Sequence, residues 1–195
     1  MNKITGKATE ESTQHILERG IRHIAAEMLA SGEIDVFIGY EEGTLPLRTT
    51  PAFITRPEDA SRLVWGPACE NNLTVYLPKF QAPKFQGTVG IVAKGCDVRT
   101  LTNLILENQI HRDKVKIVGI PCSGIVHRAN VLAASCEACR YPVPVLYDVL
   151  VGDESMARDA RDPEAAYFKV DEFAQLEPDV RFSYFAHEIE GCIQC

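Results

Sequence analysis

The sequence predicts an α/β protein, with a partly parallel sheet, flanking helices and ligand-binding loops at the carboxyl ends of its strands. Two observations predict this class. Short apolar segments of strand length alternate with amphipathic segments of helix length, and one helix stands between two buried apolar segments. The chain has 195 residues, 46% of them hydrophobic, which is enough to bury one core. We therefore expect a single α/β domain over residues 1–190.

The first part of the chain is expected to form a helix and two strands. Residues 13–29 place apolar side chains at helical spacing, and Gly32 follows as a stop signal. Residues 34–40 and 51–55 read as short strands on either side of the turn-like segment EEGTLP. These two strands fit either the main sheet or a separate layer. Pro57 and the acidic residues after it have the composition of a first helical turn.

The central part of the chain predicts a strand, a helix and a second strand. Residues 87–95 and 114–120 are buried apolar strands, and residues 97–109 form an amphipathic helix between them. Such a unit places the two strands parallel and joins them by a crossover. Ligands of open parallel sheets bind just outside the carboxyl ends of the strands. The residues that follow each strand are therefore the candidates for function.

Cysteines stand at these positions. Cys96 in KGCD follows the first strand and Cys122 in GIPCSG follows the second, so both are expected at the same edge of the sheet. Further along, SCEACR adds Cys136 and Cys139 as a CxxC pair. Four thiolates suit a tetrahedral zinc or a [4Fe-4S] cluster. Structural zinc usually draws on two CxxC-like pairs, so the single pair favours a cluster. Zinc, inert buried thiols and a redox dithiol stay open as alternatives.

Charge and cysteine usage narrow the classes of function. The net charge of −7 argues against nucleic acid as a partner. No apolar run is long enough to span a membrane, and the N-terminal residues have no secretory pattern. Seven cysteines without such a signal predict a cytoplasmic protein whose thiols bind metal or take part in catalysis. There is no Ser/His/Asp or paired-carboxylate pattern of a hydrolase, and we name no catalytic residue.

Three segments carry a resemblance to a known family. CENNLTVYLP, the unit from VGIVAKGCD to VGIPCSG, and CEACRYPVPVLYDVLVGD resemble the beta-subunit family of coenzyme F-420-reducing hydrogenases and F-420-linked formate dehydrogenases. The likeness is greatest to the branch found beside heterodisulfide-reductase-like electron-transfer modules, and it runs from about Ser12 to the end of the chain. It implies an oxidoreductase subunit that relays electrons between the redox centres of such partner subunits and a flavin, F-420 or ferredoxin carrier. The alternative is a non-redox α/β adaptor with a structural zinc, which docks a neighbour through the apolar segment VRFSYFAHEIEG.

The resemblance also implies which residues bind the cofactors. It assigns a [4Fe-4S] cluster to Cys96, Cys122, Cys136 and Cys139, with Cys69 in GPACENNL as a reserve ligand that competes with Cys96 for the fourth place. Apart from the resemblance, His127 lies five residues after Cys122 in the sequence and is a weaker ligand candidate. For FAD, the family commonly has a Lys-Gly-Gly stretch before the first helix, where this chain has KATEESTQHIL. The positions that still match a flavin site are Lys94, Arg99, Asp148 and Gly152.

The chain closes on EGCIQC, in which Cys192 and Cys195 form a second CxxC pair. In the branch that the chain resembles, a ferredoxin-like run of cysteines begins here. We therefore expect residues 191–195 to be the start of a truncated ferredoxin-like segment, holding the first half of a second cluster site.

Overall fold

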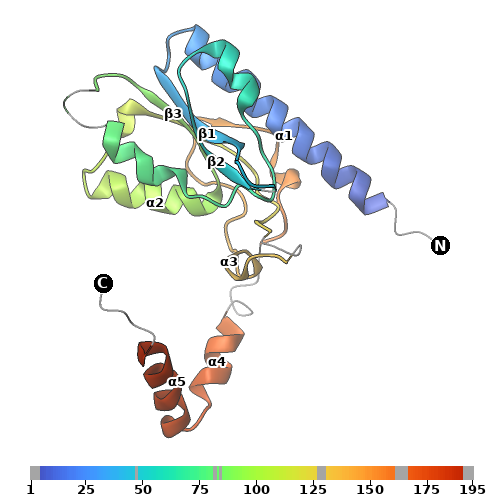
Figure 1. Ribbon diagram of the computed structural model, residues 1–195, viewed down its shortest axis with the longest axis vertical. Helices are drawn as coiled ribbons and strands as arrows, with labels where there is room; N and C mark the ends of the chain where they lie inside the picture. The colour runs from blue at the N-terminus through green and yellow to red at the C-terminus, as the bar shows by residue number, and fades with distance from the viewer. Residues whose placement is uncertain are drawn as a thin grey trace.

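A five-stranded sheet forms the centre of the molecule (Figure 1). The computed structural model describes residues 5–46, 48–80, 83, 85–126, 131–160 and 167–190. The strands are β1 (Val36–Glu42), β2 (Thr49–Ile54), β3 (Val89–Ala93), β4 (Val115–Gly119) and β5 (Val149–Leu150), in the order β2-β1-β3-β4-β5. Only β1 and β2 pair antiparallel, and the other neighbours are parallel. The predicted α/β class with a partly parallel sheet is confirmed, and the early strand pair belongs to the main sheet.

Helices flank this sheet and follow it in the chain. The α-helices are α1 (Thr5–Ala30), α2 (Gly95–Leu106), α3 (Ala134–Glu137), α4 (Phe168–Ala174) and α5 (Pro178–Glu190). Short 3-10 helices span Pro57–Arg62, Leu73–Phe80, Arg112–Lys114 and Glu154–Met156. The helix predicted over residues 13–29 is present but begins earlier, at Thr5, and Gly32 with a φ of 73° follows its end as expected of a stop residue. The turn after Pro57 is a 3-10 helix, which is the tighter form common in short connections.

The core lies between the sheet and the helices that pack on it. Helix α1 contacts β1 and β3, and α2 contacts β3. From α1, Leu17, Ile21 and Ala25 are buried, and the strands contribute fully buried side chains such as Phe37 and Ile91. Each large apolar side chain buried in this way contributes about 1.5–3 kcal/mol. The sheet is therefore a stable base for the loops at its edge.

The predicted crossover unit is present as β3, α2 and β4. The register runs from Val89 opposite Val115 to Ala93 opposite Gly119, so both strands end at the same edge of the sheet. Cys96 comes three residues after the end of β3, and Cys122 three residues after the end of β4. Helix α2 begins at Gly95, earlier than predicted, so Cys96 lies in its first turn.

The C-terminal helices α4 and α5 differ from the rest of the fold. Figure 1 shows them beside each other, below the sheet. None of their described residues belongs to the core cluster, and none is buried. Across the part of the chain that the structure describes, no helix combines the length and the apolar character needed to span a membrane.

Candidate metal centre

Four cysteines line one small cavity at the carboxyl edge of the sheet. The cavity has a volume of about 70 Å³, and its walls include the thiols of Cys96, Cys122, Cys136 and Cys139, hereafter the cavity cysteines. They come from the first turn of α2, the loop after β4, and the segment around α3. Cys136 and Cys139 lie close enough to Cys122 to contribute to the rise in its pKa, and Cys122 and Cys139 contribute in the same way to the pKa of Cys96. The fold therefore places these four residues around one cavity.

A glycine lets two of these segments approach each other. A Cβ on Gly95 would lie 1.9 Å from the carbonyl oxygen of Tyr141, which no side chain can tolerate. The absence of a side chain there allows the segment after Cys139 to lie directly against the start of α2. The backbone N–H of Cys122 donates to the carbonyl of Pro142 (2.9 Å), which ties the loop after β4 to the same segment. Close packing of three backbones thus positions the thiols.

Backbone N–H groups point at two of the sulfurs. Gly124 N lies 3.3 Å from Cys122 Sγ, and Ile125 N lies 3.3 Å from Cys136 Sγ. Gly124 has a φ of 104°, a left-handed conformation that suits glycine and turns these amides inward. N–H donors of this kind stabilise negative charge on thiolate sulfur and raise the reduction potential of a bound cluster.

The thiols of Cys96 and Cys122 are held in their neutral form when no metal is bound. Desolvation in the cavity raises the pKa of the Cys96 thiol to about 11, with Asp97 adding to the effect, although another part of this residue is exposed at the surface. Burial raises the pKa of Cys122 to about 11. A metal ligand must be a thiolate. A positively charged metal group in the cavity would supply the charge that stabilises the thiolates, aided by the N-terminal end of α2 beside Cys96.

A buried cation connects the cavity to a neighbouring loop. Lys94, 2% exposed, donates to the Tyr40 hydroxyl and to the carbonyls of Cys69 (3.1 Å) and Asn71 (3.2 Å). Its Nζ also lies 3.2 Å from the carboxylate of Asp97, which is 1% exposed. Burial opposes the charge on Lys94, but Asp97 and Tyr40 hold the pKa of its ammonium above the ordinary lysine value. The loop of residues 69–71 is thereby fastened to the start of α2.

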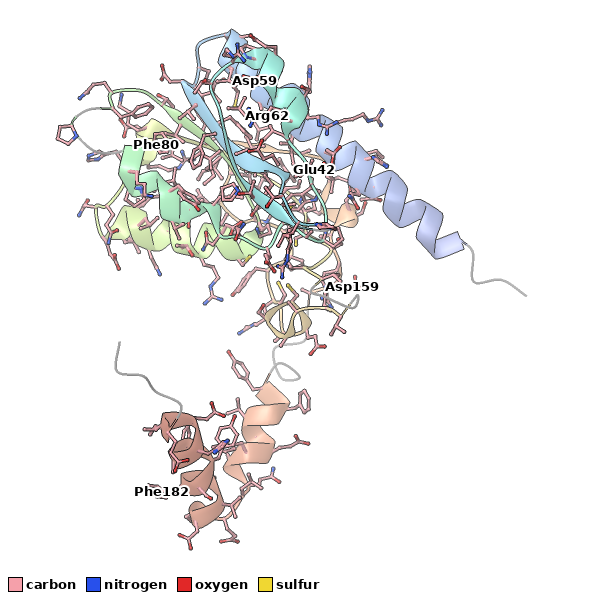
Figure 2. All side chains as sticks on the ribbon, in the orientation of Figure 1. Glu42, Asp59, Arg62, Phe80, Asp159 and Phe182 are labelled. Atoms are coloured by element: carbon pink, nitrogen blue, oxygen red, sulfur yellow. The ribbon has the colours of Figure 1, made fainter. Side chains whose placement is uncertain are left out.

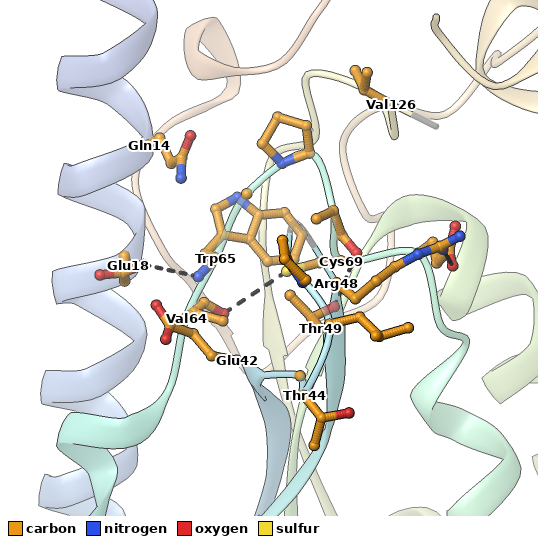
Figure 3. A pocket seen from close by; sticks show the side chains of 17 residues that line it. Gln14, Glu18, Glu42, Thr44, Arg48, Thr49, Val64, Trp65, Cys69 and Val126 are labelled. Carbon is orange, nitrogen blue, oxygen red and sulfur yellow. Dashed lines mark hydrogen bonds and ion pairs between the residues drawn. The ribbon is translucent and has the colours of Figure 1, made fainter. Parts of the chain in front are cut away.

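Cys69 lies away from the cavity cysteines. It is fully buried, its thiol faces the carbonyl of Val64 (3.9 Å), and it lines a different, wider cavity (Figure 3). Burial raises the pKa of Cys69 to about 11. Of the two candidates for the fourth ligand, the fold brings Cys96 to the small cavity and leaves Cys69 outside it.

The wider cavity has a volume of about 980 Å³ and lies between α1, the β1–β2 connection and residues 64–70. Figure 3 shows Trp65 in its wall, between α1 and the strands. Its charged side chains are Glu18, Glu42, Glu70 and Arg48, and the last two form an ion pair. Three carboxylates and one already paired guanidinium do not fit the pyrophosphate of a flavin.

The four predicted flavin residues do not form one group. The Lys94 ammonium is already bonded inside the protein, as described above. Arg99 is exposed, with its guanidinium 6.0 Å from the centre of the Tyr141 ring. Asp148 pairs with Arg112 (2.8 Å) and accepts from a backbone N–H of β4. Gly152, with a φ of 76°, lies against α1. These four residues therefore do not form a site that fits FAD.

Two residues of the small cavity could not be expected from the sequence. Arg158 lines it and donates from Nη1 to the carbonyl of Cys136 (2.8 Å). It comes from an acid-rich stretch, GDESMARDARD, whose composition is typical of a solvated loop. Tyr141 also lines the cavity. No local pattern marks either residue, because the return of these segments to the cavity is a tertiary contact.

Other predicted ligands lie outside the described residues. These are Cys192 and Cys195, together with His127 and the segment 191–195. Within the ranges that the structure describes, no group of three or more His, Cys, Asp or Glu side chains is arranged to hold one metal ion.

Comparison with known proteins adds a structural similarity. No protein-family model matches the chain, and no curated protein matches it. The fold is similar to that of a chain from the F420-reducing [NiFe] hydrogenase complex of Methanosarcina barkeri, studied by xenon derivatization, with 21% sequence identity and a TM-score of 0.48. The match covers 64% of this chain and 43% of the chain from the hydrogenase complex, so this chain spans less than half the length of that protein. A likeness at this level does not assign a function.

Proposed function

We propose that the chain is an iron–sulfur electron-transfer protein that holds a [4Fe-4S] cluster through the four cavity cysteines. The observation that carries the proposal is the convergence of thiols from three separate segments on one cavity, at the sheet edge where ligands of parallel sheets bind. The sequence resemblance to F-420 hydrogenase and formate dehydrogenase beta subunits supports it independently of the geometry.

The pattern of the cysteines favours a cluster over a single zinc ion. Structural zinc is usually bound by two CxxC-like pairs, whereas the cavity cysteines are one such pair and two single cysteines that follow strands. In a [4Fe-4S] cluster each thiolate binds a different iron, so ligands from separate segments can surround it.

The protein contributes position and electrostatics. When bound, a [4Fe-4S] cluster accepts and donates one electron at a time. Gly95 and Gly124 allow the backbones to approach, and the amides of Gly124 and Ile125 donate to the sulfurs. Arg158 fixes the CxxC segment through the carbonyl of Cys136. Because Cys96 is exposed while the other cavity cysteines are half-buried, one side of the site faces the surface, where a partner can approach.

Partners would supply the donor and the acceptor. On this proposal the chain relays electrons between the redox centres of a hydrogenase, formate dehydrogenase or heterodisulfide-reductase-like subunit and a flavin, F-420 or ferredoxin carrier. The flavin itself is not assigned to this chain, since the described cavities do not provide a phosphate site. Release of a yellow chromophore on denaturation of the purified protein would show that the chain does bind a flavin.

Anaerobic purification of the full chain tests the cluster. We expect a brown protein with about four iron and four sulfide ions per chain. Cys122→Ser and Cys96→Ser should each lose most of the iron, and Cys69→Ala, the matched control, should retain it. A colourless protein with one zinc ion, or full iron content in Cys122→Ser, would contradict the proposal. Loss of iron in Cys69→Ala but not in Cys96→Ser would mean that Cys69, and not Cys96, is the fourth ligand.

A further inference from the structure

Large apolar side chains remain exposed on the C-terminal hairpin, which we define as residues 167–190 and which contains α4 and α5. Phe182 is 75% exposed and Ile189 is 70% exposed. Seven further apolar residues of the hairpin are at least 43% exposed, namely Tyr167, Phe168, Val170, Leu176, Val180, Tyr184 and Phe185. Exposed apolar residues are common singly, but nine of them within 24 consecutive residues are typical of an interaction surface.

The two helices pack against each other through aromatic rings. The ring of Phe173 on α4 lies 5.3 Å from that of Tyr184 and 5.5 Å from that of Phe185, both on α5. Phe182 lies on the side of α5 that faces away from α4 (Figure 2). Phe182 and Ile189 are spaced i and i+7, so they lie on the same side of α5 and form an apolar stripe along it.

The charge of the hairpin indicates the kind of partner. Of its 24 residues, six are acidic and two are basic, which gives −4 of the chain's net charge of −7. The acidic residues are Asp171, Glu172, Glu177, Asp179, Glu188 and Glu190. Two copies of the hairpin would bring these carboxylates together, and like charges across an interface cost affinity. A partner surface that carries Lys and Arg beside its apolar residues is complementary to the hairpin, because it pairs its positive charges with these carboxylates.

We propose that the C-terminal hairpin is a docking surface for a basic amphipathic helix of a partner protein. A helix fits because the stripe on α5 presents anchors at helical spacing. The proposal does not rest on the cluster, because none of the hairpin residues lines the cysteine cavity.

Binding of two synthetic amphipathic peptides to the full chain tests this proposal. Both peptides carry the same leucine face, and the polar face is lysine in one and glutamate in the other. By fluorescence anisotropy we expect the lysine peptide to bind, the glutamate peptide not to bind, and salt to weaken the binding. Phe182→Asp should weaken binding of the lysine peptide by about tenfold or more, the loss expected of a central anchor. Leu106→Asp, at a 73% exposed position on α2, is the matched control and should leave it unchanged.

The choice of Phe182→Asp separates the apolar contribution from charge. The substitution adds a negative charge, so tighter or unchanged binding of the lysine peptide would mean that electrostatics alone holds it and would overturn the proposal. Equal binding of the glutamate peptide would overturn it as well. The double variant Asp179→Asn, Glu190→Gln keeps the apolar stripe and should weaken binding of the lysine peptide. A dimer of the wild-type chain in light scattering that Phe182→Asp dissociates would show that a second copy covers the surface instead.

Discussion

The cysteine edge of the sheet and the C-terminal hairpin are stabilised in different ways. At the cysteine edge, backbones touch at Gly95, amides donate to sulfur, and Lys94 and Asp97 form a buried ion pair. In the hairpin, none of the described residues is buried, and the large apolar side chains face outward. The first region is held in shape by its own contacts before any ligand binds. In the second region, most of the apolar surface stays available to a partner protein, as we propose above for the C-terminal hairpin. Substitutions in the two regions should therefore differ in their effect on the free energy of unfolding.

Removal of the buried cation should have the largest effect on stability. Lys94→Met leaves the carboxylate of Asp97 buried without its partner, and loss of one member of such a pair costs about 3–5 kcal/mol. We expect this loss in the free energy of unfolding of the metal-free chain, measured by urea denaturation. Lys94→Met, Asp97→Asn is the matched control, and it should recover part of the loss because no unpaired charge remains. An equal loss in both variants would mean that the ion pair is not the cause.

Alkaline pH should destabilise the metal-free protein through its buried thiols. Burial raises the pKa of Cys69 from 9.0 to about 11, so its stabilising effect is complete below pH 9 and is lost as the pH rises to about 11. A difference of two units corresponds to about 2–3 kcal/mol for this group. We expect the free energy of unfolding to fall over this range. The fall should be smaller in Cys69→Ala, and the same slope in both proteins would contradict the assignment.

A methyl group on Gly95 should distort the cysteine edge. Gly95→Ala places a carbon against the carbonyl of Tyr141, and overpacking of this kind costs about 1–3 kcal/mol. The measurement is urea denaturation together with the iron content of the anaerobically purified protein, and both should fall. Asn103→Ala, on the exposed side of α2, serves as the control and should change neither. Normal iron content in Gly95→Ala would show that the close approach is not needed for the site.

The smallest effect is expected in the hairpin. Phe182→Ser removes a large apolar side chain that is 75% exposed, so the free energy of unfolding should change by no more than about 0.5 kcal/mol. Thermal and urea denaturation measure this change. A loss above about 2 kcal/mol, typical of core truncation, would mean that Phe182 packs inside the protein, and the contrast between the two regions would fail.

Much of the sheet and the site follows from local patterns. Alternation of apolar strands with an amphipathic helix predicted β3, α2 and β4, and parallel pairing placed Cys96 and Cys122 at one edge. The roles of Lys94 and Arg158 could not be predicted in this way. A lysine in a Gly-bearing turn has the same local pattern whether it is solvated, binds phosphate or is buried against a distant tyrosine. The contacts of Lys94 with Tyr40 and Asn71 show that it is buried, and both of these residues are far from Lys94 in the sequence.

The sequence by itself determined the α/β class, the crossover unit and the position of Cys96 and Cys122 after its two strands, because hydrophobic periodicity and the place where a strand ends are local properties. Only the tertiary structure decided that Cys96 and not Cys69 faces the shared cavity, that Lys94 is held internally, and that the apolar residues of α5 stay exposed. These depend on which distant segments come into contact, and burial and charge pairing are set by such contacts and not by the neighbours of a residue along the chain.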